Sequence, residues 1–300
     1  MHSIRHIMVV LKAEQSDSLP LKRAKYLASA LQAELHLLLC DTRHDHAVFL
    51  RRLSGQLVAE GFRVTTEQHA SDHLHPTNGI LDSLRTRPCG LVIKQHYPDN
   101  PLTHKLLTPD DWKLLRQSPV PVLMTKTDRP WDDGVVLAAM DIDNDESEHR
   151  NLQGSIIAHA VDLAALIHGS VHAVCAYPET PFSAADPCAP RYDGNAHHCL
   201  EACRWFQEEY QLRAHQIHVA EGPAKALITQ FAHQLEVAVT VIGTVGRSGL
   251  AGAWIGNTAE AVLNRIDSDV LILKPHDPDL HLLEPLEEGE PLPEQSRVSA

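Results

Sequence analysis

The sequence has little of several features that mark specialised classes of protein. Aromatic residues make up 5% of its 300 residues, and its 6 cysteines show no paired spacing of a disulfide framework. No apolar run approaches the roughly 18 residues of a membrane span. Residues 1–12 lack the long apolar core and small-residue cleavage site of a signal peptide. These absences predict a cytoplasmic protein with reduced thiols and no membrane partner.

Positive charge is also scarce, and this excludes one class of partner. The formal net charge is −13, which argues against a protein whose main partner is a nucleic-acid backbone. The charge is uneven, because residues 1–127 carry 16 Lys/Arg against 12 Asp/Glu, whereas residues 128–275 carry 9 against 20. The first part is therefore mildly basic and the second is acidic.

What is present is a regular alternation of short apolar runs and longer amphipathic stretches. Ten runs predict strands: Ile7–Leu11, Glu34–Cys40, Phe62–Thr66, Leu91–Lys94, Val120–Thr125, Val135–Asp141, Ser170–Ala176, Gln216–Ala220, Val237–Ile242 and Val270–Leu273. The stretches between them predict helices near 18–32, 46–60, 77–86, 109–117, 151–168, 194–212, 223–235 and 257–266. Such alternation is typical of α/β proteins with parallel sheets covered by helices on both faces.

The alternation occurs twice, and the two copies can be aligned residue by residue. A shift of 148 positions places Gly90–Lys126 on Ala238–Lys274 without a gap. We therefore predict one domain over residues 1–127 and a second over 135–275, packed as a pseudo-dimer within the chain. Residues 276–300 are rich in proline and acid and predict a disordered tail.

The pattern that indicates chemistry is a spaced set of glycines after the strand Val237–Ile242. Gly243 and Gly246 are followed, after nine intervening residues, by Gly256, and Asn257 and Thr258 open a helix. Glycine lets the backbone approach a ligand closely, and an N-cap at Asn257 would leave free N–H groups for an anion. A glycine-rich surface loop that binds nothing is the alternative, but the strand before and the helix after it favour a phosphate site.

A carboxylate follows the first strand of the second copy. In doubly wound sheets, ligands bind at the carboxyl edge beside that strand, where the strand order reverses. Asp141 would accept a hydrogen bond there from a base amine or a ribose hydroxyl. The alternative, which Asp143 and Asp145 nearby support, is a solvated turn aspartate.

These residues resemble a known family. The glycine pair followed by Gly256-Asn257-Thr258, the strand ending in Asp141 and the segment Glu221-Gly222-Pro223 are similar to universal stress proteins. The stretch beginning at Thr108-Pro109-Asp110 adds a resemblance to the tandem, two-domain E-type branch of Gram-negative bacteria. The resemblance implies two flavodoxin-like domains, each a doubly wound parallel five-stranded sheet of order 3-2-1-4-5.

The resemblance also implies an adenine-nucleotide site in the second domain, for ATP, ADP or AMP. The adenine would lie near Asp141 and the end of the second strand, at Val174 or Ala176. Ribose and phosphates would lie on Gly243, Gly246, Arg247, Gly256, Asn257 and Thr258. One departure is Asn257, which stands where many nucleotide-binding members have Ser.

The first copy lacks this pattern. Under the 148-residue shift Gly243, Gly246 and Gly256 fall on Gln95, Pro98 and Thr108, so ATP binding is not expected there. Lys12 and Lys94 would instead stand at adjacent strand ends. We expect them to extend into solvent, with an unusual anionic ligand as the alternative.

Three clusters were weighed as metal sites: His197-His198-Cys199 with Cys203, then His69, His73 and His75, then His96 with His104. None has structural zinc spacing, and chance clusters are expected among 21 histidines, so no metal site is predicted.

Catalytic motifs are missing as well, including the phosphate loop and the Gly-x-Ser-x-Gly elbow. A nucleotide-dependent transferase would need a base or lysine near the phosphates, whereas residues 243–258 offer only Arg247. The prediction is therefore a stress-response protein that binds nucleotide without dedicated catalysis, with slow ATP hydrolysis left open. It would act with an unidentified protein partner, and further homodimerisation is left open. A stress scaffold that binds another ligand, lipid-like or metal, is the competing interpretation.

Overall fold

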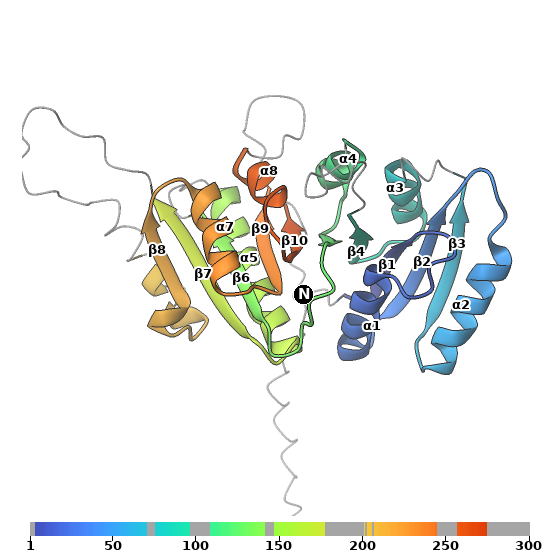
Figure 1. Cartoon of the computed structure of the whole chain (residues 1–300), viewed down its shortest axis with the longest axis horizontal. Helices are drawn as coiled ribbons and strands as arrows, with labels where there is room; N and C mark the ends of the chain where they lie inside the picture. Colours follow the sequence, from blue (N-terminus) through green and yellow to red (C-terminus); the bar gives the residue numbers. More distant parts are fainter. Residues whose placement is uncertain are drawn as a thin grey trace, which may run out of the picture.

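The structure is a computed structural model that describes residues 4–70, 76–96, 109–141, 147–177, 201, 203–205, 207–244 and 257–274. The predicted acidic tail, 276–300, lies outside these residues. Figure 1 shows two α/β halves side by side. We call residues 4–127 the first half and residues 135–274 the second half.

In the first half the elements are β1 His6–Leu11, α1 Leu19–Leu31, β2 Glu34–Cys40, α2 Ala47–Ala59, β3 Val64–His69, α3 Thr77–Thr86, β4 Leu91–Gln95, α4 Pro109–Gln117 and β5 Val122–Thr125. In the second they are β6 Val135–Met140, α5 Ser147–Leu166, β7 Ser170–Tyr177, the 3-10 helix η2 Ala214–Gln216, β8 Ile217–Glu221, α7 Ala224–Gln234, β9 Val239–Gly243, α8 Asn257–Leu263 and β10 Asp269–Leu273. Helical residues also lie between 201 and 209.

The ten strands form one sheet in the order β3-β2-β1-β4-β5-β10-β9-β6-β7-β8. Within each half all strand pairs are parallel, and each half has the predicted order 3-2-1-4-5. The predicted fold class is therefore confirmed. Since β1 and β6 lie inside their half-sheets with a crossover on either side, each half has a switch point at its first strand.

Two hydrophobic cores lie on opposite faces of this sheet. Side chains of α1, α2 and α5 pack on one face, and those of α3, α4, α7 and α8 pack on the other. Alternate residues of β1 enter different cores, with Val9 in the first and Met8 and Val10 in the second. Burial on both faces explains why the central strands read as continuous apolar runs.

The halves join through β5 and β10, which pair antiparallel with Leu123 opposite Leu271. These two leucines are equivalent under the 148-residue shift, so the pseudo-twofold axis of the repeat passes between them. The strands β4 and β9 are also related by this shift along their whole length. The repeat found in the sequence is thus a spatial repeat about the central strand pair.

A reciprocal pair of lysines closes this joint. The Lys126 Nζ atom donates to the carbonyl of Leu263, the last residue of α8, and to that of Ile266 just beyond it, each at 2.7 Å. Its equivalent, Lys274, donates to the carbonyls of Arg116 (2.8 Å) and Ser118 at the end of α4. Each half therefore supplies the cation that caps a helix carboxyl end of the other.

The linker between the halves, residues 128–134, and the two residues before it contact a fully buried carboxylate, that of Asp269. Its Oδ2 atom accepts from Arg23 Nε at 2.8 Å and Trp131 Nε1 at 3.0 Å, and its Oδ1 atom accepts from the backbone N–H groups of Lys126 and Thr127. Arg23 also stacks over the Trp131 ring, 4.7 Å from its centroid. The linker is therefore part of the packed joint.

Candidate functional site

Three of the predicted ligand residues lie at one edge of the second half. Ala139 of β6 pairs with Ile242 of β9, and Met140 pairs with Cys175 of β7. Asp141, Ala176 and Gly243 follow these residues, so they stand at the carboxyl ends of three adjacent strands. This is the edge beside the switch strand β6, where doubly wound sheets bind ligands.

Asp141 is exposed at the start of the loop after β6. Its backbone N–H donates to Gln153 Oε1 at 2.9 Å, and Gln153 is buried on α5. The buried amide fixes the direction in which the chain leaves the strand, and the carboxylate stays within reach of a ligand at the edge.

Gly243 has a packing role that the sequence interpretation did not anticipate. A Cβ atom added there would lie 2.6 Å from Leu152 Cδ2 and 3.0 Å from Ile156 Cδ1, both on α5. The absence of a side chain therefore lets α5 approach the end of β9. The interpretation that Gly243 serves only ligand approach is incomplete for this physical reason.

After Gly243 the chain is anchored before it enters the glycine loop. The Thr244 N–H and hydroxyl both donate to the Leu273 carbonyl, at 2.8 and 3.2 Å, and the side chain is buried. Gly246, Arg247 and Gly256, which were predicted to hold ribose and phosphates, lie outside the described residues.

The helix that follows the loop is described from Asn257, the residue at which the sequence predicts its start, and it ends at Leu263 rather than near residue 266. Asn257 is the first residue of α8, whereas a capping role would place it just before the helix. Thr258 is exposed in the first turn, and Glu260 is the acidic residue of that turn. Thr258 therefore lies directly after the loop, in the first turn of α8.

The first half carries a buried ionic cluster near the corresponding edge. Lys94 of β4 forms an ion pair with Asp111 of α4, whose other carboxylate oxygen lies 3.1 Å from His96 Nδ1. Asp111 is fully buried, and the Lys94 and His96 side chains are 9% and 3% exposed. The expectation that Lys94 extends into solvent is therefore wrong, because Asp111 compensates its charge inside the fold; Lys12 is exposed as expected.

The histidine and cysteine clusters named from the sequence lie partly within the described residues. His73, His75, His104, His197, His198 and Cys199 lie outside the described residues. His69 stands 4.0 Å from Asp82, and His96 belongs to the buried cluster with Asp111. The Cys203 thiol instead donates to Cys175 Sγ at 3.4 Å, in the core of the second half.

Sequence reasoning missed two histidine groups. Asp41, His44 and His46 converge at the carboxyl end of β2, and an Asp-x-x-His-x-His spacing directly after a strand was the available signal. On β7 and β8, His172 and His218 stack with ring centroids 5.2 Å apart. Those two residues are 46 positions apart, so no local pattern could pair them.

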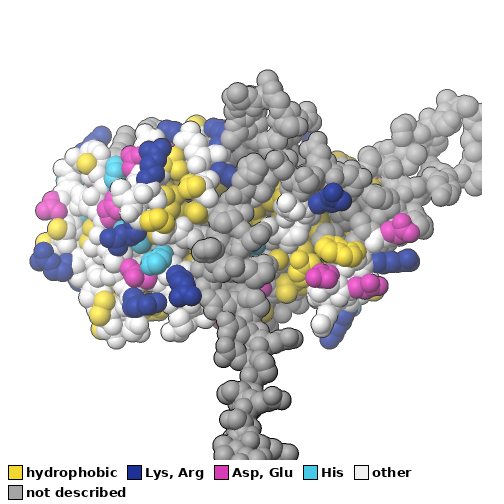
Figure 2. Space-filling view, turned by 180° about the vertical axis from the view of Figure 1, so that it is seen from behind, with side chains coloured by type: hydrophobic (Ala, Val, Ile, Leu, Met, Phe, Trp, Pro, Cys, Tyr) yellow, Lys and Arg dark blue, Asp and Glu magenta, His cyan; other side chains and the backbone are white. Residues whose placement is uncertain are grey.

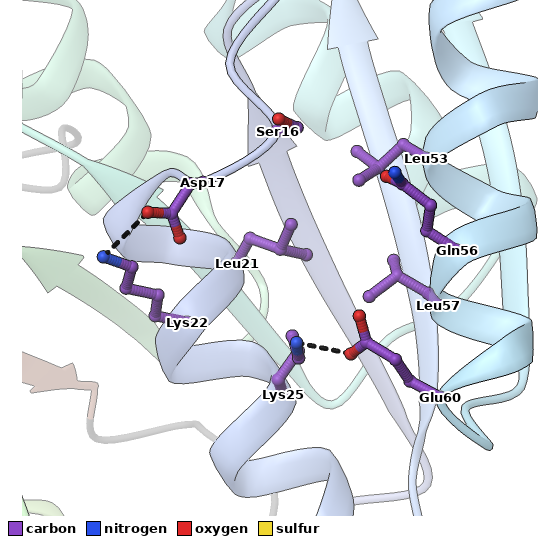
Figure 3. Close-up of a pocket in the computed structure, with 9 residues that line it drawn as sticks. All are labelled: Ser16, Asp17, Leu21, Lys22, Lys25, Leu53, Gln56, Leu57 and Glu60. Carbon is purple, nitrogen blue, oxygen red and sulfur yellow. Dashed lines mark ion pairs between the residues drawn. The ribbon is translucent and has the colours of Figure 1, made fainter.

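A cavity of about 250 Å³ lies in the first half, between α1 and α2, away from the predicted nucleotide edge. Figure 3 shows two ion pairs at this cavity, Lys22 with Asp17 at 3.2 Å and Lys25 with Glu60. Because each lysine here has a carboxylate partner, the cavity offers little net charge to an anion. On the face shown in Figure 2, Lys and Arg side chains are scattered over the surface of the first half.

Among the described residues, no helix combines the length and apolarity that crossing a bilayer requires.

The comparisons with known proteins point to one family. The model of the universal stress protein family matches residues 136–274. Universal stress protein E of Escherichia coli strain K12 is 28% identical, over 90% of this chain and 94% of the relative.

Solved structures agree with this match. A Pseudomonas aeruginosa UCBPP-PA14 protein assigned to the universal stress proteins is 49% identical, with a TM-score of 0.82 over 93% of this chain and 96% of that one. A universal stress protein of Archaeoglobus fulgidus DSM 4304 is 15% identical and shares the fold, with a TM-score of 0.61 over 91% of this chain and 100% of that one. With its two halves in tandem, the chain belongs to the universal stress protein family, whose members serve the stress response.

Proposed function

We propose that the second half binds an adenine nucleotide, ATP, ADP or AMP, at the edge formed by β6, β7 and β9. The observation that carries the proposal is the position of Asp141, Ala176 and Gly243 at three adjacent strand ends. The glycine loop follows directly after the last of these, Gly243. An open doubly wound sheet binds its ligand at this place.

Each residue has a role that its chemistry supports. Asp141 accepts a hydrogen bond from the base amine or a ribose hydroxyl, and Ala176 leaves room for the flat base. Gly246, Arg247 and Gly256 approach ribose and phosphates, with Asn257 and Thr258 opening the following helix. Arg247 is the cation of this set, and its guanidinium suits bidentate contact with a phosphate.

The mode of action that we propose is binding rather than turnover. Residues 243–258 contain no lysine, histidine or carboxylate that would act as a base beside the phosphates. Nucleotide binding would fix the conformation of residues 245–255 against the phosphates and so change a surface to which a protein partner binds. Amide exchange in this loop, slowed by saturating ATP, is the expected signature.

Nucleotide binding can be tested with matched substitutions at equivalent positions of the two halves. We expect the full chain to bind ATP in calorimetric titration, and Gly256→Val to abolish binding because a branched side chain fills the space of the phosphates. Thr108→Val changes the equivalent position of the first half and should leave the affinity unchanged. Asp141→Ala should weaken binding about tenfold, the value of one charged hydrogen bond.

Folding must be checked in the same variants by thermal unfolding. Loss of ATP binding in Gly256→Val with an unchanged melting temperature supports the proposal. The absence of any adenine nucleotide in acid extracts of the purified protein, together with no titration signal for ATP, ADP or AMP at millimolar concentration, would refute it. That result would favour the scaffold with a different ligand.

A further inference from the structure

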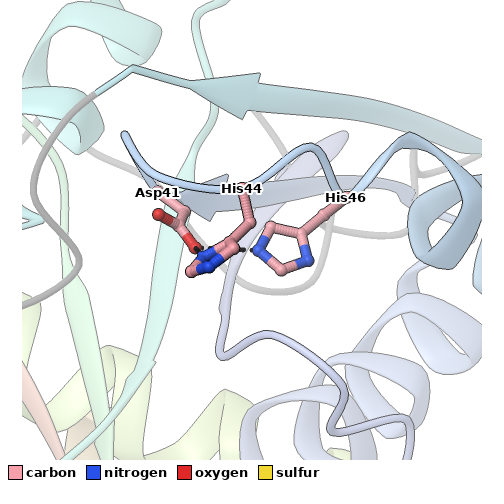
Figure 4. A group of neighbouring side chains, drawn as sticks. All are labelled: Asp41, His44 and His46. Atoms are coloured by element: carbon pink, nitrogen blue, oxygen red, sulfur yellow. Dashed lines mark hydrogen bonds and ion pairs between the residues drawn. The ribbon is translucent and has the colours of Figure 1, made fainter.

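A compact group of metal-ligating side chains lies at the carboxyl end of β2 in the first half. The chain passes through residues 41–46 before α2 begins, and Figure 4 shows the side chains of Asp41, His44 and His46 turned toward one another. Each offers one ligand atom, and the three atoms lie within 4.8 Å of one another. We propose that this group binds a divalent transition metal ion of the zinc class.

The separations between donor atoms fit such an ion. Asp41 Oδ2 lies 2.8 Å from His46 Nε2 and 3.4 Å from His44 Nδ1. Ligands at about 2.0–2.1 Å from a tetrahedral zinc ion are about 3.3 Å apart. Small side-chain adjustments around a central ion would therefore meet the required geometry.

Hydrogen bonds hold the loop in this shape without an ion. Asp41 Oδ1 accepts from the Arg43 N–H at 2.7 Å, which leaves Oδ2 to face the histidines. Gln68 of β3 accepts from the His46 N–H at 2.8 Å and donates to the His44 carbonyl at 2.7 Å. The neighbouring strand thus orients the backbone of both histidines. The loop would therefore lose little conformational entropy when it binds an ion.

Glu14, from the loop after β1, adds a feature typical of metal sites. Its Oε1 atom lies 3.7 Å from His46 Nδ1, the ring nitrogen that does not face Asp41. A carboxylate behind a ligating histidine fixes the tautomer with Nε2 free for the metal and makes the ring a stronger donor. The 3.7 Å separation exceeds hydrogen-bond distance, but the Glu14 side chain is 69% exposed and free of steric confinement, so a small rotation on metal binding would make Glu14 a positioning residue for His46.

The donor set and its exposure select the class of ion. Two imidazole nitrogens and one carboxylate suit zinc, cobalt, nickel or copper, whereas magnesium and calcium prefer oxygen ligands alone. Asp41 and His46 are 10% and 11% exposed, but His44 is 72% exposed. An ion would thus be held from the protein side and reached from solvent, with a coordination position left for water or an exogenous ligand.

The test titrates the full chain with ZnCl2 by calorimetry at pH 7.5 and with CoCl2 by visible absorption. We expect one zinc ion per chain and cobalt bands of tetrahedral intensity. The double variant His44→Gln with His46→Gln should lose at least 100-fold in zinc affinity, and Glu14→Gln should lose about 10- to 100-fold. MgCl2 and CaCl2 should give no signal.

The control addresses the other histidines of the chain, of which there are 21 in all. His168→Asn with His233→Gln removes two exposed imidazoles of the second half and should leave zinc affinity and stoichiometry unchanged. Zinc should also raise the melting temperature of the wild type, but not that of the His44/His46 variant. Equal zinc binding by the wild type and the His44/His46 variant would overturn the proposal, and so would a wild type without a zinc signal.

Discussion

The two halves share a fold and a register, yet near the carboxyl edge of the sheet the first half has charged residues at positions where the second half has uncharged ones. The first half has Lys94, His96 and Asp111, a buried ionic cluster, where the second half has Ile242, Thr244 and Ala259. The change accompanies the loss of the glycines, since Gly243 corresponds to Gln95. The comparison teaches that the same buried positions are filled by a charge-compensated cluster in one half and by uncharged side chains in the other.

The joint between the halves shows a second asymmetry, and breaking it should have the largest effect. Asp269 accepts four hydrogen bonds, from the side chains of Arg23 and Trp131 and from the backbone of Lys126 and Thr127, whereas the equivalent position 121 holds a proline. We expect Asp269→Asn to cost about 3–5 kcal/mol in the free energy of unfolding, because the Arg23 charge stays buried without its partner. Urea unfolding followed by circular dichroism measures this loss.

A control on the same linker is Asp128→Asn, since Asp128 is exposed. It should change the free energy of unfolding by less than about 0.5 kcal/mol. Equal stability of the Asp269 and Asp128 variants would show that the buried carboxylate does not hold the joint.

The ionic cluster of the first half gives the second prediction. Asp111→Ala leaves the Lys94 ammonium buried without a counter-charge, and should cost about 3 kcal/mol. The triple variant Lys94→Ile, His96→Thr and Asp111→Ala installs the residues of the second half. It should recover most of that loss, because apolar packing can replace a buried ion pair at little net cost. A triple variant less stable than Asp111→Ala alone would contradict this account; both are measured by urea unfolding.

These residues also show how far the sequence could predict the structure. The strands β4 and β9 were found because both faces of these central strands are buried, which produces apolar runs in both copies. The edge strand β3 was predicted at Phe62–Thr66 but spans Val64–His69, because its polar end, Glu67 to His69, pairs with β2 on one side only and shows no apolar run.

The candidate site was predicted less completely for a different reason. Asp141, Ala176 and Gly243 could be placed because strand ends follow directly from the strand pattern. The partner of Lys94 could not be seen in a single copy, since Asp111 is 17 residues away on a helix. Comparing the two copies did indicate the cluster. The positions equivalent to Lys94, His96 and Asp111 all hold uncharged residues in the second half, so the three residues differ together.

Substitution of Lys126 and of Lys274 compares how much each of these equivalent residues stabilises the joint between the halves. Lys126 donates two hydrogen bonds to carbonyls at and just beyond the end of α8, and Lys126→Met should cost about 2 kcal/mol. Lys274→Met should cost about 1 kcal/mol, because its bond to the Arg116 carbonyl is exposed to solvent. Urea unfolding of both single variants ranks the two caps, and a larger loss for Lys274→Met would reverse the proposed asymmetry.

The smallest expected effect concerns two equivalent histidines with different partners. His36 is the third residue of β2 and His172 the third residue of β7. His36 Nε2 lies 3.2 Å from the Glu67 carboxylate, whereas His172 Nδ1 lies 2.9 Å from the imidazole of His218. Burial lowers the pKa of all three histidines; the Glu67 carboxylate opposes this for His36, and the charge of His218 adds to it for His172.

The sign of the pH dependence follows from these directions. A histidine whose pKa is lowered by folding binds fewer protons in the folded state, so its contribution to stability is complete above the unfolded pKa of about 6.5 and falls as the pH falls below it. We expect the second half to lose stability between pH 7 and 5, and His218→Glu, which gives His172 a carboxylate partner like that of His36, to reduce the loss. NMR titration should show the pKa of His172 below 6.5 and rising in the variant. An unchanged His172 titration would show that the His218 partner does not set this difference between the halves.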